Sequence, residues 1–122
     1  SNQNVDVTGS GNTFTLNQGT TALAASLDLD WIINGSNNTV TSNINIDGAT
    51  NYMDIDGDDN VVTYDGDGYA GGYFYLDHTG NTRTFNIDQE STSDNDWLKI
   101  TSAGSNGTVC VTQSDSGNSF VC

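Results

Sequence analysis

The densest group of side chains that could do chemistry is a run of aspartates in the middle of the chain. The run contains Asp54, Asp56 and Asp58, and Asp65 and Asp67 follow at a short distance. Carboxylate oxygens on tight turns are the ligands that Ca²⁺ prefers in proteins. The sequence therefore makes a calcium site at these aspartates a candidate, with solvated turn aspartates as the alternative. No cofactor is expected to be required.

A catalytic centre is not predicted, because the sequence lacks the motifs that place a nucleophile beside a base. Its one histidine, His78, falls at a turn of the repeats described below, where it is expected at the surface. Paired aspartates could act as acid and base, but nothing in the sequence selects a pair. We therefore predict that the chain is not an enzyme and has no catalytic residue.

Net charge restricts the partners that the chain could bind. Two basic residues, Arg83 and Lys99, stand against sixteen acidic ones, which gives a formal charge of −14. Contacts to phosphates need Lys and Arg, so no nucleic-acid partner is expected. No apolar stretch approaches the roughly eighteen residues that a membrane span needs, so no membrane span is predicted either.

The two cysteines, Cys110 and Cys122, both lie in the last thirteen residues. Their spacing is not that of a zinc site, so a disulfide bond between them is predicted, with two unpaired thiols as the alternative. Disulfide bonds persist in oxidising compartments. Because the sequence also shows neither a basic-then-apolar leader nor an initiating Met, we expect a mature, secreted, extracellular protein.

A recurring pair of glycine and asparagine marks the elements that must position these residues. The asparagines stand at positions 12, 38, 60, 81 and 106, so successive copies are 21 to 26 residues apart. A repeat of this length is typical of a solenoid. The predicted corners are Gly9 and Asn12, Gly35 and Asn38, Gly57 and Asn60, Gly80 and Asn81, and Gly104 and Asn106.

Alternating apolar residues lead into each corner, and a Thr-rich alternating run leads out of it, as in Tyr52-Met53-Asp54-Ile55 and Val61-Val62-Thr63-Tyr64. This pattern predicts a strand, a tight turn and a second strand. We therefore expect an all-β, single-domain β-solenoid over residues 1–122, with about five repeats and a thin core. The segment 19–28 could form a helical turn or a strand, and its sequence does not decide between them.

Glycine and asparagine suit a sharp corner because both accept a positive φ at low cost. An asparagine at every corner could also pair its amide with the asparagine of the next coil, which predicts an asparagine ladder through the stack. The alternative is that asparagine is present only because it favours turns.

These corners resemble the curlin repeat of secreted curli fibre subunits, whose pattern is S-x5-Q-x-G-x2-N-x-A-x3-Q. The central G-x2-N is reproduced by Gly9/Asn12, Gly35/Asn38 and Gly57/Asn60. In the first unit, Ser1 and Gln18 also match the first and last positions of the pattern. The resemblance implies a stack of two-stranded coils whose end strands are open to another copy. It also implies a secreted subunit that polymerises head to tail in a biofilm matrix.

The leading hypothesis for function is therefore a structural subunit of an extracellular filament that assembles from copies of itself, for matrix or attachment. The absence of proline, which would block strand pairing at an open edge, also favours it.

Two alternatives remain open. The main alternative is an adhesin or phage-fibre-like binding module that recognises a glycan or a cell-surface receptor. Its candidate stacking platform consists of Tyr69, Tyr73, Tyr75 and His78. Alternation predicts that Tyr73 and Tyr75 point outward if Phe74 and Leu76 point inward. The minor alternative is an ice-binding solenoid, because stacked coils would form a threonine array from Thr13/Thr15, Thr39/Thr41 and Thr82/Thr84.

Overall fold

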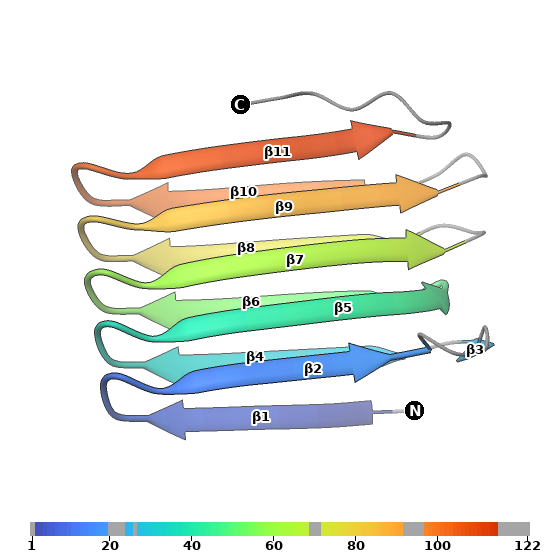
Figure 1. Ribbon diagram of the computed structural model, residues 1–122, viewed down its shortest axis with the longest axis horizontal. Coiled ribbons are helices and arrows are strands. Elements are labelled where there is room, and N and C mark those ends of the chain that lie inside the picture. Colours follow the sequence, from blue (N-terminus) through green and yellow to red (C-terminus); the bar gives the residue numbers. More distant parts are fainter. Residues whose placement is uncertain (1, 20–23, 26, 69–71, 92–96, 115–122) are drawn as a thin grey trace.

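Two parallel β-sheets lie face to face in the computed structural model, which describes residues 2–19, 24–25, 27–68, 72–91 and 97–114 (Figure 1). In spatial order, sheet A consists of β1 (Asn2–Thr8), β4 (Asp28–Asn34), β6 (Thr50–Asp56), β8 (Tyr73–Thr79) and β10 (Trp97–Ala103). Sheet B consists of β2 (Thr13–Gln18), β5 (Thr39–Asp47), β7 (Val61–Gly68), β9 (Thr84–Ser91) and β11 (Thr108–Ser114), and the short β3 (Ala24–Ala25) pairs with β5.

Each coil of the chain is one strand of sheet A, a corner and the next strand of sheet B. Coil 1 contains β1 and β2, coil 2 contains β4 and β5, coil 3 contains β6 and β7, coil 4 contains β8 and β9, and coil 5 contains β10 and β11. The coils stack in sequence order, so every strand pairs with the equivalent strand of the coils next to it (Figure 1). The predicted all-β solenoid is therefore confirmed.

The core is the thin layer of inward-pointing side chains between the two sheets. Strict alternation along each strand sends every second residue inward, and residues of equivalent strands then stack in rows, such as Trp31, Met53 and Leu76. The apolar residues that are fully buried all belong to coils 2 to 4 or to the segments that lead into them. Of the inward apolar residues of coils 1 and 5, Val109 is exposed, and the others are only partly buried: Val5, Val7, Phe14, Leu16, Leu98, Ile100 and Val111.

Each corner is a four-residue segment with two positions of positive φ. The first position is always glycine: Gly9 (133°), Gly35 (150°), Gly57 (139°), Gly80 (153°) and Gly104 (130°). The third position has left-handed helical backbone: Gly11 (74°), Asn37 (60°), Asp59 (58°), Thr82 (51°) and Asn106 (59°). Only glycine accepts the first conformation readily, whereas Asn and Asp tolerate the second. The glycines therefore set the register of the corners.

The last two predicted corner asparagines differ from the first three in position. Asn81 is the second residue of its corner and Asn106 is the third, while Arg83 and Gly107 hold the fourth position, where the earlier corners have asparagine. The physical reason is that the residue with left-handed backbone always occupies the third position of the corner. In coil 4 this residue is Thr82, so Asn81 occupies the second position. The sequence pattern had placed Thr82 in a strand.

The described part of the segment 19–28 contains strand and no helix. Residues Ala24–Ala25 form β3, and β4 begins at Asp28. The rest of the ambiguous run, residues 20–23 and 26, lies outside the described residues.

Candidate functional site

A ladder of hydrogen bonds runs along the second residues of the five corners. The Oγ of Ser10 accepts the N–H of Ser36 at 3.2 Å, and the Oγ of Ser36 accepts the N–H of Asp58 at 3.0 Å. The Oδ1 of Asp58 accepts the N–H of Asn81 at 2.6 Å, and the Oδ1 of Asn81 accepts the N–H of Ser105 at 2.9 Å. Sequence reasoning missed this ladder, although a short side chain with an acceptor oxygen follows every corner glycine.

The corner asparagines form a second, shorter ladder. The Oδ1 of Asn38 accepts the N–H and the Nδ2–H of Asn12 at 3.0 and 3.2 Å, and the Oδ1 of Asn60 accepts the N–H of Asn38 at 2.9 Å. Coils 4 and 5 lack it, so the predicted ladder extends over coils 1 to 3 only. In coil 4 the fourth corner residue is Arg83, and its side chain lies against Gly107, the fourth corner residue of coil 5. A Cβ added to Gly107 would lie 2.5 Å from the Cγ of Arg83.

The aspartates considered as a calcium site are distributed over different parts of the solenoid. Asp54 and Asp56 lie on the outer face of sheet A, whereas Asp65 lies on the outer face of sheet B. Asp58 is in a corner and uses its Oδ1 in the first ladder, and the side chain of Asp67 lies outside the described residues. Among the described residues, no three His, Cys, Asp or Glu side chains are grouped so that they could hold a metal ion.

His78 is buried inside the solenoid, so the prediction of an exposed turn residue is wrong. It lies in β8 and is 1 % exposed, with its ring edge against Phe85 at a centroid distance of 5.0 Å. Its Nε2 lies 3.3 Å from the carbonyl oxygen of Gly57, and its Nδ1 lies 3.2 Å from the Oγ of Ser102. Because a carbonyl can only accept, this arrangement places the proton on Nε2 and makes Nδ1 an acceptor.

The burial of His78 makes stability depend on pH. Burial lowers the pKa of His78 below its ordinary value of 6.5, and Arg83 lowers it further, while the bond to Gly57 and the charges of Asp56 and Asp58 act in the opposite direction. The unfolded chain therefore binds the proton at a higher pH than the folded chain does. The free energy of unfolding is expected not to change with pH well above 6.5, the ordinary pKa of histidine. It is expected to fall as the pH drops below about 6.5.

Urea unfolding between about pH 8 and pH 5.5 measures this dependence. The chain has one histidine, so the His78→Phe variant is expected to lose the slope in this range. A variant with the same slope as the parent protein would show that another group titrates.

Four aromatic side chains form a continuous group on the outer face of sheet A. The ring centroids of Tyr75 and Trp97 are 4.6 Å apart, those of Tyr52 and Tyr75 are 6.3 Å apart, and those of Tyr73 and Trp97 are 6.5 Å apart. We call these four residues the aromatic patch. They come from β6, β8 and β10, and only the register of the coils brings them together.

Two members of the predicted sugar platform belong to the aromatic patch. Tyr73 and Tyr75 point outward and Phe74, between them, is fully buried, so this prediction from alternation is confirmed. The buried His78 is not part of the surface, and Tyr69 lies outside the described residues. The contributions of β6 and β10 were missed because unequal loop lengths hide the register in the sequence.

Two rows rich in threonine run across the outer face of sheet B. The first row is Thr13, Thr39, Val61, Thr84 and Thr108, and the second is Thr15, Thr41, Thr63, Asn86 and Cys110. The predicted threonine array is therefore present in part. It differs at Thr82, which sits in the corner of coil 4 and not on this face.

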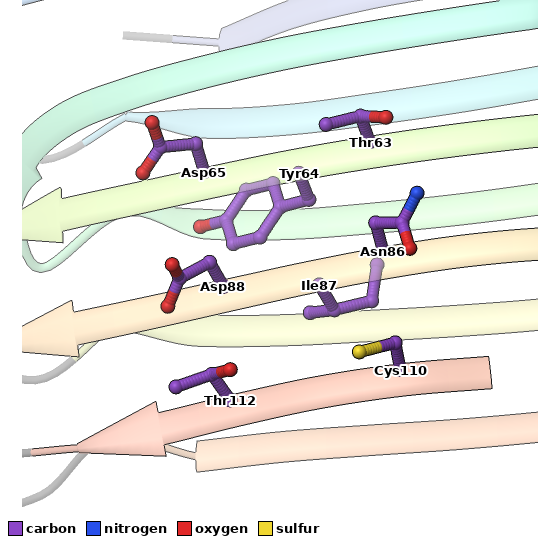
Figure 2. Close-up of a pocket in the computed structure, with 8 residues that line it drawn as sticks. All are labelled: Thr63, Tyr64, Asp65, Asn86, Ile87, Asp88, Cys110 and Thr112. Atoms are coloured by element: carbon purple, nitrogen blue, oxygen red, sulfur yellow. The ribbon is translucent and has the colours of Figure 1, made fainter. Parts of the chain in front are cut away.

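A pocket of about 310 Å³ lies on the outer side of sheet B. It is lined by Thr63, Tyr64, Asp65, Asn86, Ile87, Asp88, Cys110 and Thr112, and Figure 2 shows them on three neighbouring strands. Asp65 and Asp88 are register partners on β7 and β9, so two carboxylates lie side by side there. Cys110 is not a free thiol. Cys122 lies outside the described residues, so the bridge between the two cysteines stays a prediction.

The two end coils differ from the middle coils in charge. Coil 1 has one acidic residue, Asp6, and coil 5 has none, whereas Lys99 lies in coil 5. The negative charge of the described strands is therefore concentrated in coils 2 to 4. Among the described residues, the strands of both end coils pair with a neighbouring coil on one side only.

No protein-family model, curated protein or solved structure matches the chain. Within the described ranges there is no helix of the length and apolarity that a membrane crossing requires. The class of protein that the fold defines is a two-sheeted parallel β-solenoid with polar corner ladders.

Proposed function

We propose that this chain is a structural subunit of a secreted, extracellular filament, in which copies stack head to tail along the solenoid axis for matrix or attachment. The observation that carries the proposal is the complementarity of the two end coils, because each end can continue the ladders and rows of the other. Two complementary ends on one chain give a head-to-tail contact that repeats without closing.

The corner hydrogen bonds supply the first part of this complementarity. In the second-position ladder, each N–H donates to the side chain of the preceding coil. In a stack, the N–H of Ser10 would therefore donate to the Oγ of Ser105 in the preceding copy. The corner glycines of coils 1 to 4 each donate their N–H to a carbonyl of the following coil, so Gly104 of coil 5 would donate to Thr8 of the following copy.

The inward rows supply the second part. In the register of the coils, Ile100 would stack on Val5 of the next copy and Val111 on Leu16, so apolar side chains meet apolar side chains. These residues are only partly buried in one copy. Val109 of the last coil is 43 % exposed. Stacking would remove this apolar surface from water, at a gain of about 25 cal/mol per Å².

A charge-swap experiment tests the contact directly. In the proposed stack, Lys99 would lie beside Asn4 of the next copy, and Asp6 of that copy would be a diagonal neighbour on the same outer face. At low salt, Lys99→Asp alone and Asp6→Lys alone are each expected to raise the critical concentration for filament growth about fivefold, which corresponds to about 1 kcal/mol. The double variant is expected to restore growth.

Electron microscopy and sedimentation supply the readout, and Thr63→Asp is the control because it adds a negative charge on β7, in the middle coil of the stack. Failure of the double swap to restore growth would count against the head-to-tail contact. Folded protein that stays monomeric at every salt and protein concentration would overturn the proposal as a whole.

A further inference from the structure

The aromatic patch is exposed to an extent that the fold does not require. Tyr52 is 38 % exposed, Tyr73 is 43 % exposed and Trp97 is 42 % exposed, and Tyr75 connects them. Single exposed apolar residues are ordinary, but contiguous exposed rings on one face mark interaction sites. The patch lies on the opposite sheet from the pocket of Figure 2.

The geometry of the patch suits an extended chain of flat rings. Its members come from three successive strands of one sheet, which are about 4.8 Å apart, so the patch is about 10 Å long. The rings lie on the outer surface of the sheet, and the contacting rings are tilted to one another by 41° to 46°. Rings held in this way offer stacking faces to a ligand and have little side-chain freedom to lose.

Carboxylates border the patch on two sides. Asp30 is the register partner of Tyr52 on β4, while Asp54 and Asp77 follow Tyr52 and Tyr75 by two residues on the same outer face. Besides burial, the charges of Asp54, Asp77 and Asp30 raise the pKa of Tyr52, so the phenol lies in a negative field. On β10 the border is different, because Lys99 is the register partner of Tyr75. A polyanion would be repelled from the carboxylates, whereas a ligand with positive groups at the edges of its rings would be attracted to them.

We propose that the aromatic patch binds a polysaccharide that carries free amino groups, such as a polymer of glucosamine. The C–H faces of the sugar rings stack on Tyr75 and Trp97, the ammonium groups lie toward Asp54 and Asp77, and the carboxylates also accept hydrogen bonds from hydroxyl groups. A row of exposed aromatic rings favours stacked sugar rings over the long side chains of a basic peptide. Binding needs one folded copy only, so this site is independent of filament formation.

Intrinsic fluorescence reports on this site directly. The chain has two tryptophans, and Trp31 is buried at 2 % exposure while Trp97 is in the patch. Titration with a glucosamine hexamer is expected to change the Trp97 emission, and the Trp97→Phe variant is expected to abolish the change and leave the Trp31 emission constant. The Tyr75→Ala variant is expected to weaken binding about tenfold through lost stacking.

Matched variants separate stacking from charge. Asp54→Asn with Asp77→Asn keeps the rings and removes two charges, so binding is expected to weaken about tenfold and to lose much of its salt dependence. Asn86→Ala, an exposed change on sheet B, is expected to bind as the parent protein does. A galacturonate hexamer, which is anionic, is expected not to bind.

Three outcomes would overturn the proposal. The first is an N-acetylglucosamine hexamer that binds as tightly as the glucosamine hexamer, because the charged border would then have no role. The second is a lysine hexamer that produces the same change in Trp97 emission, because the site would then recognise cations in general. The third is unchanged affinity in the Tyr75→Ala variant, because binding would then depend on net charge alone.

Discussion

Replacing Gly57 with alanine is expected to lower the free energy of unfolding by about 3 kcal/mol or more. The φ of Gly57 is 139°, a conformation that residues with a Cβ rarely adopt. A Cβ added there would lie 2.6 Å from the carbonyl carbon of Gly35 in the preceding coil and closer still to its oxygen. Both atoms are backbone, and the neighbouring corner is held by its own ladder bonds, so the clash cannot be relieved by a side-chain rotation.

Gly11→Asn is the matched control for this substitution. Gly11 occupies the third corner position with φ 74°, nothing lies within 4 Å of an added Cβ, and Asn37 and Asn106 already hold that position in other coils. The free energy of unfolding of the Gly11→Asn variant is therefore expected to stay within about 0.5 kcal/mol of that of the parent protein. Urea unfolding followed by far-UV circular dichroism compares the two variants. Equal stability of Gly57→Ala and Gly11→Asn would contradict the close approach of the corners, whereas failure of Gly57→Ala to fold would support it.

The local part of the fold could be predicted from the sequence because it depends on residues next to one another. Alternation around Phe74 correctly assigned the inner and outer faces of β8. A glycine at each corner, such as Gly35 and Gly57, correctly marked where the chain turns. These features depend on the period of a strand and on the freedom of glycine, and neither needs knowledge of distant contacts.

The parts that could not be predicted depend on register between coils. His78 reads as a turn residue because Gly80 follows closely, yet it is inside β8 and Gly80 begins the corner. Thr82 reads as a strand residue, yet its left-handed backbone makes it part of that corner. The aromatic patch and the second-position ladder both join residues more than twenty positions apart. Loops of unequal length between coils conceal these pairs.

Replacing Asn51 with leucine is expected to raise the free energy of unfolding by about 2 kcal/mol, the opposite sign from most core substitutions. Asn51 points into the core of coil 3 and is 1 % exposed, and its Oδ1 and Nδ2 have no hydrogen-bond partner among the described residues. In its inward row it stands between Leu29 and Phe74. Leucine has the same branch point and puts methyl groups where the two polar atoms are, so the desolvation cost disappears.

The exposed Asn34 on β4 offers the control for this change. Asn34→Leu removes a solvated amide and is expected to leave stability within about 0.5 kcal/mol of the parent protein. Thermal and urea unfolding of both variants at neutral pH measure the difference. If Asn51→Leu proved less stable than the parent protein while Asn34→Leu did not, the expected gain from removing the unpartnered amide of Asn51 would be contradicted.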